Sequence, residues 1–347
     1  MATATAEPPK RTTPGATVRV VHRSSAGAID HDWPVDRIAE ALRDAGGTTW
    51  VDVLDPGPDH SATEALFRDV FAFHPLAIDD ALHESHVPKV DDWDRYLYTV
   101  FHAIDYDRDT GDLRLHELDF FLGINFLVSY HTEPLVLLDR LRQAIARDDG
   151  NRLRRGPDHL LYNALDLGVD DYMGVIERLD DAIDDAQDEV FHRPTPHTLH
   201  EIFRIKRAAL RMHRVLSPQR EVLNRLARDQ YAQIDAPDRV YFRDVYDHLV
   251  RLHDITEGLR DLISGALDTY LSALSNRTND IMKTLTFVTV LFLPMTFLAG
   301  FFGMNFFGDN IVLSAPLPRV ALFWVTCVLM LATPWALWTM ARKRGWF

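Results

Sequence analysis

The sequence predicts an α/β domain with a mixed sheet flanked by helices, followed by a long stalk helix and two membrane-spanning helices. Strand and helix signals alternate from residue 17 to about residue 134, and helical periodicity replaces them from about Asp158. Two long runs without charge then lie near the C-terminus. The expected segments are a disordered tail (1–16), the α/β domain (17–150), helices with an acidic face (151–237), the stalk helix (238–283), a first membrane helix (284–303), an external loop (304–319), a second membrane helix (320–341) and a basic C-terminus (342–347).

The α/β domain shows five strand-like runs and at least one helix. Between the first two strand candidates, "TVRVVHR" and "TTWVDVLDP", the stretch "PVDRIAEALRDAGG" is typical of a helix, with Pro34 near its start and Gly46 near its end. Three β-rich runs follow from Arg95, Leu113 and Asn125, the last two separated by a turn near Gly123. These signals predict a sheet that mixes parallel and antiparallel strands.

Long helices follow the α/β domain. One apolar face is predicted to be buried and comprises Leu161, Leu165, Val169, Tyr172, Ile176, Leu179 and Ile183, whereas the opposite face is rich in Asp and Glu. The stretch "RPTP" at 193–196 should end this helix, and a second helix is expected over about 198–229.

A third helical pattern starts near Asp238. Its expected apolar face comprises Val245, Leu249, Leu252, Leu259, Leu262, Ala266, Tyr270 and Ala273. Because no proline occurs between Pro237 and Pro294, the helix can continue to Gly303, which corresponds to roughly 100 Å at about 1.5 Å per residue. A helix of this length needs partners for stability, and a stalk of several chains would provide them.

The two runs without charge are long enough to cross a membrane. Thr284–Gly308 spans 25 positions and Val320–Ala341 spans 22, whereas about 20 apolar residues suffice for a spanning helix. The alternative is a pair of buried core helices, but soluble folds rarely contain such long runs. Basic residues flank both runs at their outer ends, so both termini should be cytoplasmic and the protein should lie in the plasma or inner membrane.

The charge distribution points toward cations. The chain carries a net charge of −14, of which residues from 281 onward contribute +4, so residues 1–280 carry −18. Such a domain repels nucleic acid and attracts cations. The sequence shows no nucleophile–base pattern and no phosphate-binding glycine loop, which argues against an enzyme. A single cysteine, Cys327, excludes a disulfide within the chain.

A partly polar stripe follows the long helix into its membrane segment. It comprises Asp268, Ser275, Asn279, Met282, Thr286, Thr289, Leu293, Thr296 and Gly300, and its steps of 7, 4, 3, 4, 3, 4, 3 and 4 correspond to a period of 3.5 residues. A polar stripe on a membrane helix faces a bundle interior or water. It therefore either forms hydrogen bonds between packed helices or lines a pore. The residues expected to line a pore are Asn279, Met282, Leu285, Thr286, Thr289, Leu293, Thr296 and Gly300. One such helix cannot enclose a pore, so a symmetric oligomer is expected, with its number of subunits left open.

Several stretches resemble one known family. "MKTLTFVTVLFLPMTFLAGFFGMNF" is similar to the first membrane helix and Gly-Met-Asn signature of the CorA family of magnesium transporters, and "FHPLAIDDALHESHVPKVDDWDRYLYTVFHAI", "FFLGINFLVSYH", "LLYNALDLGVDDY" and "YFRDVYDHL" resemble further family blocks in the same order. The resemblance covers nearly everything after residue 17. It implies a funnel-shaped homopentamer that carries divalent cations passively through the lipid membrane, driven by the membrane potential, with no organic cofactor.

The resemblance also implies which residues handle Mg²⁺. A ring of Gly303, Met304 and Asn305 would select the hydrated ion at the pore entrance. Mg²⁺ gives up its water shell reluctantly, and a neutral amide can accept hydrogen bonds from those waters without trapping the ion. Gating by intracellular Mg²⁺ is expected at subunit interfaces, where the matching acids are Asp79, Asp80, Asp166, Asp244 and Asp268.

Two alternatives stay open from the sequence. One is a Zn²⁺, Co²⁺ or Ni²⁺ transporter of the same fold, and the other is a membrane-anchored metal sensor that does not conduct. The family often carries a Met-Pro-Glu-Leu segment in the external loop, whereas this loop reads "FFGDNIVLSAPLPR". Its absence leaves Asp309 as the single acid of the loop and makes the choice of ion less certain.

Overall fold

The computed structural model describes residues 15–83, 87–107, 110, 112–147, 150–192, 194–304 and 319–343. The chain divides into two compact units, Met1–Asp268 and Thr269–Phe347, which are treated separately below. Most of the predicted N-terminal tail, most of the predicted external loop and the last four residues lie outside the described residues.

A seven-stranded mixed sheet forms the centre of the first unit, in the order β2-β1-β3-β7-β6-β5-β4. β3 and β7 pair in parallel, and every other pairing in this sheet is antiparallel, which confirms the predicted mixed sheet. The two strands that the sequence did not predict, β2 and β4, are two and four residues long, too short to show a periodicity. The strands are β1 (Thr17–Arg23), β2 (Ile29–Asp30), β3 (Thr48–Leu54), β4 (Lys89–Asp92), β5 (Tyr96–Tyr106), β6 (Leu113–Gly123) and β7 (Phe126–His131).

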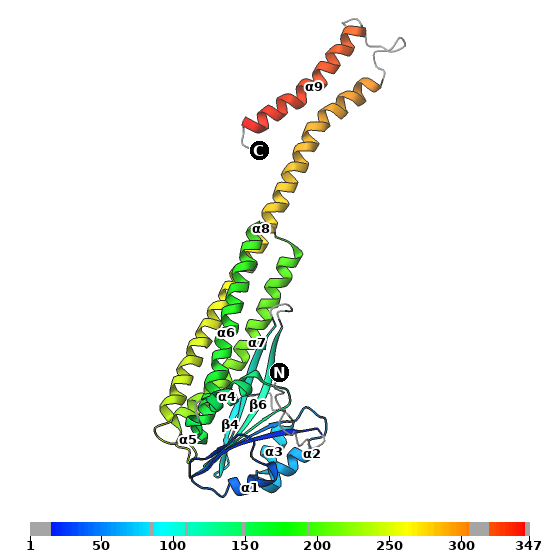
Figure 1. Cartoon of the computed structure of the whole chain (residues 1–347). Coiled ribbons are helices and arrows are strands. Elements are labelled where there is room, and N and C mark those ends of the chain that lie inside the picture. Colours follow the sequence, from blue (N-terminus) through cyan, green and yellow to red (C-terminus); the bar gives the residue numbers. More distant parts are fainter. Residues whose placement is uncertain are drawn as a thin grey trace, which may run out of the picture. The chain divides into compact units, whose positions relative to one another are not determined.

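One face of the sheet packs against short helices. They are α1 (Ile38–Ala41), which follows a 3-10 turn at Val35–Arg37, α2 (Ser61–Ala65), which continues as a π-helical turn at Leu66–Val70, and α3 (Pro75–Leu82). Phe121 of β6 is fully buried there, stacked on Phe73 at 4.2 Å between ring centroids and 5.3 Å from Phe67. An aromatic core therefore holds this layer of helices on the sheet. Figure 1 shows α1, α2 and α3 beside the sheet.

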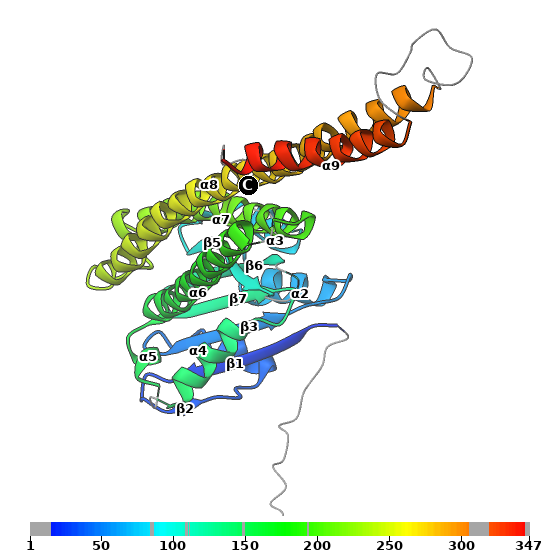
Figure 2. The same cartoon turned by 90° about the horizontal axis from the view of Figure 1, so that it is seen from above.

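Longer helices cover the other face, beginning with α4 (Val136–Arg147), α5 (Asn151–Arg154) and α6 (Pro157–His192). Tyr172 of α6 meets Phe101 of β5 edge to face, and its hydroxyl donates a 2.6 Å hydrogen bond to the His102 carbonyl. Gly168 makes this approach possible, because a Cβ there would lie 2.5 Å from the Phe101 ring. The unit is thus an α/β/α arrangement, with α6 laid along the sheet (Figure 2).

The three long helices confirm most of the predicted pattern. Every residue of the predicted apolar face of α6 is buried. The stretch before Pro196 separates α6 from α7 (Pro196–Arg228), and the Thr195 side chain caps α7 by accepting from the Thr198 amide at 3.2 Å. α8 (Arg239–Gly303) is one continuous helix of 65 residues, as predicted.

The predicted apolar face of α8 is not buried at two of its positions, because Leu262 is exposed and Ala273 is only half-buried. Leu262 is 45% exposed, whereas Ile263 and Thr256 are buried. Thr256 is polar, but its hydroxyl donates to the Leu252 carbonyl at 2.7 Å and so needs no other partner in the buried stripe. The buried stripe in the first unit keeps steps of three and four throughout and comprises Phe242, Val245, Leu249, Leu252, Thr256, Leu259, Ile263 and Ala266.

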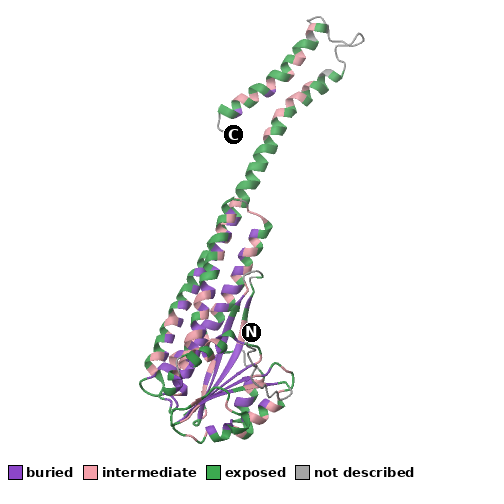
Figure 3. Cartoon of the chain, viewed as in Figure 1, coloured by how far each residue is buried: buried purple, intermediate pink, exposed green. Residues whose placement is uncertain are grey.

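The second unit consists of the rest of α8 and of α9 (Arg319–Lys343). Both helices are long and apolar enough to cross a membrane. None of the most apolar 18-residue window of α8 is buried, and only 6% of that of α9 is, as the predominantly exposed colouring of these segments shows (Figure 3). Core helices of soluble proteins are largely buried, so this exposure separates the two segments from that class.

We expect Phe121→Ala to destabilise the first unit by about 3–5 kcal/mol, because it removes a fully buried ring and leaves a cavity in the aromatic core. The measurement is the unfolding midpoint of the full chain in detergent, followed by circular dichroism. Ile124→Ala is the matched control, since Ile124 is 72% exposed just after β6. Equal midpoints for both variants would contradict the assigned core.

Candidate metal-ion sites

Two of the three threonines of the polar stripe have their protons engaged within the helix. Thr289 donates to the Leu285 carbonyl at 2.9 Å, and Thr296 donates to the Phe292 carbonyl at 3.0 Å. A hydroxyl whose proton is used in this way offers only acceptor lone pairs to its surroundings. Acceptors are what a hydrated cation needs, because its water ligands present their protons outward.

The predicted pore-lining residues all lie on exposed surface of α8 in the described chain: Asn279, Met282, Leu285, Thr286, Thr289, Leu293, Thr296 and Gly300. Exposure alone does not single out this face, because Phe292 and Phe297 on other faces are 56% and 69% exposed. What distinguishes the stripe is its content of amide and hydroxyl groups. Its assignment to a pore therefore remains a prediction.

The end of α8 coincides with the start of the Gly-Met-Asn tripeptide. The helix ends at Gly303, and the Met304 amide donates to the Phe301 carbonyl at 3.3 Å. The Met304 side chain is 56% exposed. Asn305, the predicted ligand of hydrated Mg²⁺, lies outside the described residues.

Two of the predicted regulatory acids come together inside the first unit. Asp166 on α6 is half-buried, and burial together with the charges of Asp170 and Asp244 raises its pKa above the ordinary value. The Tyr162 hydroxyl donates to Asp166, and burial followed by the charges of Asp166 and Asp244 raises the Tyr162 pKa to about 12. Repelling acids held on two facing helices favour a bridging cation.

The other predicted regulatory acids have different surroundings. Asp80, at the end of α3, forms an ion pair with Lys89 at 2.5 Å, and Lys89 also pairs with Asp91 at 3.2 Å. Asp79 is paired with the His83 imidazole at 3.1 Å. Asp268 is the last residue of the first unit and is exposed. A metal ion bound at Asp80 would therefore compete with the Lys89 ammonium.

Two clusters in the described residues were not predicted from the sequence, and neither contains a predicted regulatory acid: His213, His253 and Glu257, and Asp158, Asp235 and Asp238. The acidic cluster is satisfied by protein donors. Asp158 accepts from the Asp235 amide at 3.0 Å, and Asp238 accepts from Arg155 at 2.8 Å. These hydrogen bonds from protein groups join the start of α6 to the start of α8.

The His213 cluster had only a partial signal in the sequence. His253 and Glu257 are four residues apart on one helix, which places both on one face. His213 comes from another helix, so only the folded chain brings the three together.

Comparison with known proteins identifies the family. The sequence profile described as "CorA-like Mg2+ transporter protein" matches residues 45–343. A relative from Thermotoga maritima, named cobalt/magnesium transport protein CorA, is 35% identical over 255 residues, which cover 74% of this chain and 72% of the relative. The chain belongs to the CorA-like family of Mg²⁺ transporters.

The CorA-like fold is seen directly in a solved structure. The complete structure of the CorA magnesium transporter of Methanocaldococcus jannaschii matches with a TM-score of 0.76 and 21% identity, over 94% of this chain and 98% of that one. A zinc transport protein, ZntB of Yersinia pseudotuberculosis, is 23% identical over 64% of this chain and 67% of its own length. The predicted family and fold class are confirmed, and the relatives include proteins named for magnesium, cobalt and zinc transport.

We expect Asp166→Asn to raise the melting temperature of the metal-free protein at neutral pH. Because the folded state raises the Asp166 pKa above its ordinary value of 3.8, ionisation of this group costs stability as the pH rises through the raised pKa. The advantage of the variant should therefore shrink as the pH falls toward 3.8. Thermal melts with a chelator present, across this pH range, provide the measurement.

The control for that experiment is Asp180→Asn, at an exposed position of the same helix. It removes the same charge from the acidic domain and leaves the repulsion between Asp166 and Asp244 unchanged. If both variants gained equally at every pH, general charge reduction would explain the effect and the Asp166–Asp244 repulsion would not.

Proposed function

We propose that this chain forms a passive, potential-driven path for hydrated Mg²⁺ across a membrane, as one subunit of a symmetric oligomer. The observation that carries the proposal is the stripe of acceptor groups on α8, where the Thr289 and Thr296 protons are turned back onto the helix. This stripe lies on a segment that the described chain leaves exposed and that is apolar enough to span a membrane. Facing copies of the stripe would enclose a path lined by acceptors.

Acceptor oxygens without charge suit an ion that keeps its water. Mg²⁺ holds an octahedral water shell tightly, so hydrogen bonds from its waters to hydroxyl and amide oxygens can guide it without dehydration. Conduction requires binding that is weak enough for release. A mouth made of Gly303, Met304 and Asn305 carries no charge that would trap a dication.

The membrane potential is a sufficient driving force. It contributes about 2.3 kcal/mol per elementary charge per 100 mV, or about 4.6 kcal/mol for a dication. The acidic domain, with −18 on residues 1–280, would raise the local cation concentration on its side of the membrane. With both termini cytoplasmic, this is the side that senses the internal supply.

Internal Mg²⁺ is proposed to regulate the path through the acidic groups. Within one chain, a bound dication would relieve the repulsion between the half-buried Asp166 carboxylate and the Asp244 carboxylate. Asp79, Asp80 and Asp268 would act at contacts between subunits of a homopentamer. Loss of the cations would leave the acids repelling one another, which loosens those contacts and favours opening.

A second candidate cargo is Zn²⁺, Co²⁺ or Ni²⁺. The similarity to the Yersinia zinc transport protein and to a cobalt/magnesium transport protein favours testing these ions beside Mg²⁺. The proposed path offers oxygen acceptors, which suit Mg²⁺, and its residues include no imidazole or thiolate, the ligands that Zn²⁺ prefers. We therefore place Mg²⁺ first.

The test is ion flux into proteoliposomes under an imposed membrane potential, comparing Mg²⁺, Zn²⁺ and Co²⁺. We expect Mg²⁺ entry that Asn305→Ala abolishes. Thr296→Val, which keeps the shape and removes the hydroxyl, should lower the flux roughly fivefold or more, because one hydrogen bond contributes about 1 kcal/mol in each subunit.

Thr333→Val on α9 is the matched control. Thr333 also donates to the carbonyl four residues earlier, at 2.7 Å, but it lies outside the proposed stripe. An equal loss of flux in the two threonine variants would count against the stripe as the pore wall. Absence of flux for every ion in the unaltered protein would favour a sensor.

A further inference from the structure

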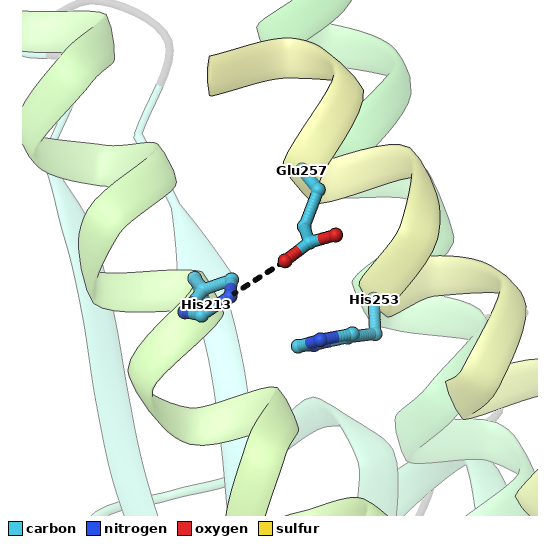
Figure 4. A group of neighbouring side chains, drawn as sticks. All are labelled: His213, His253 and Glu257. Carbon is cyan, nitrogen blue, oxygen red and sulfur yellow. Dashed lines mark ion pairs between the residues drawn. The ribbon is translucent and has the colours of Figure 1, made fainter. Parts of the chain in front are cut away.

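Two histidines and a glutamate meet between α7 and α8 in the first unit. His213 comes from α7, and His253 and Glu257 come from successive turns of α8 (Figure 4). One potential ligand atom from each side chain lies within 4.8 Å of the other two. The imidazole rings lie 4.8 Å apart between centroids, tilted by 33°.

One imidazole nitrogen of each histidine in this cluster lacks a hydrogen bond. His213 Nε2 and His253 Nδ1 are both buried and have no hydrogen-bond partner among the described residues. The 3.8 Å separation of His213 Nε2 from Glu257 Oε1 is too long for a hydrogen bond. Buried polar nitrogens without partners are costly, so the cluster has binding capacity that the protein does not use.

The electrostatic surroundings keep an imidazole available as a ligand. Burial lowers the His253 pKa, and the nearby Arg220 and His213 lower it further, against the opposing charges of Glu257 and Asp254. A neutral ring has a free lone pair, which is the form that binds metals.

We propose that His213, His253 and Glu257 form a binding site for a transition-metal dication of the Zn²⁺ and Co²⁺ class. Two imidazoles and one carboxylate, with water in the remaining position, match the donor set of such ions. Mg²⁺ prefers oxygen ligands and is not expected to compete. The site would thus distinguish the two classes of ion within one chain.

The three ligand atoms, which lie within 4.8 Å of one another, would have to move closer together to bind an ion. With bonds of about 2.0–2.2 Å, neighbouring ligand atoms lie roughly 3.3 Å apart, compared with 3.8 Å between His213 Nε2 and Glu257 Oε1. The Glu257 side chain is 59% exposed, so it can rotate toward the two rings. A bound ion would fasten α8 to α7 inside the first unit. This inference is independent of the proposed Mg²⁺ path, because it concerns binding and not transport.

The test uses the purified full chain in detergent, stripped of metal with a chelator and titrated with Co²⁺. We expect a visible absorption band characteristic of imidazole-bound, low-coordinate Co²⁺, which is removed by added Zn²⁺ and persists in excess Mg²⁺. The double variant His213→Gln/His253→Gln should lose the band, and Glu257→Gln should weaken Co²⁺ binding roughly tenfold or more.

The matched control is His197→Gln/His200→Gln, which removes two exposed histidines from the same helix, α7. It should leave the band unchanged. Circular dichroism and gel filtration of each variant check that the fold is retained. An identical Co²⁺ titration of the unaltered chain and the folded His213→Gln/His253→Gln variant would overturn the site, as would Co²⁺ bound with no imidazole-dependent band.

Discussion

The architecture of this protein depends on apolar helix surface that its own chain leaves uncovered. In the second unit, the candidate spanning segments of α8 and α9 leave almost all of their apolar side chains unburied among the described residues. Helices satisfy their backbone hydrogen bonds internally, so such segments can be stable in hydrocarbon, where water cannot replace those bonds. The remaining requirement is to place the few hydroxyl and amide groups away from lipid, which favours association with other copies along the polar stripe.

The same helix meets a different requirement inside the first unit. There α8 buries one stripe at steps of three and four from Phe242 to Ala266, with Thr256 accommodated by a hydrogen bond to its own helix. α8 therefore continues from a stripe packed against protein to an exposed apolar segment long enough to cross a membrane, within one unbroken helix. A continuous helix of 65 residues is the simplest way to connect the two environments.

The two kinds of metal site proposed for the first unit both use residues of α8. Asp244 faces Asp166 across the gap to α6, where oxygen ligands and repulsion between acids suit Mg²⁺. His253 and Glu257, farther along α8, face His213 of α7, where nitrogen ligands suit a softer ion. The mixed sheet holds α6 in place through the contacts of Tyr172 with Phe101 and His102, and thereby fixes one partner of the acidic pair.

The sequence by itself determined the elements whose signals are long and periodic. The mixed sheet, the buried face of α6, the unbroken α8 and the two uncharged runs follow from patterns that extend over many residues. The short strands β2 and β4 did not follow, because a few residues carry no period. The burial of Ile263 in place of Leu262 did not follow either, because neighbouring apolar positions can exchange roles when the packing partner is unknown.

Tertiary structure alone decided the contacts between helices that are distant in sequence. It placed Asp166 beside Asp244 and gave Asp80 a lysine partner. It also brought His213 to His253, since ligand sets depend on which helix faces lie opposite each other and the order of residues along one chain does not specify that.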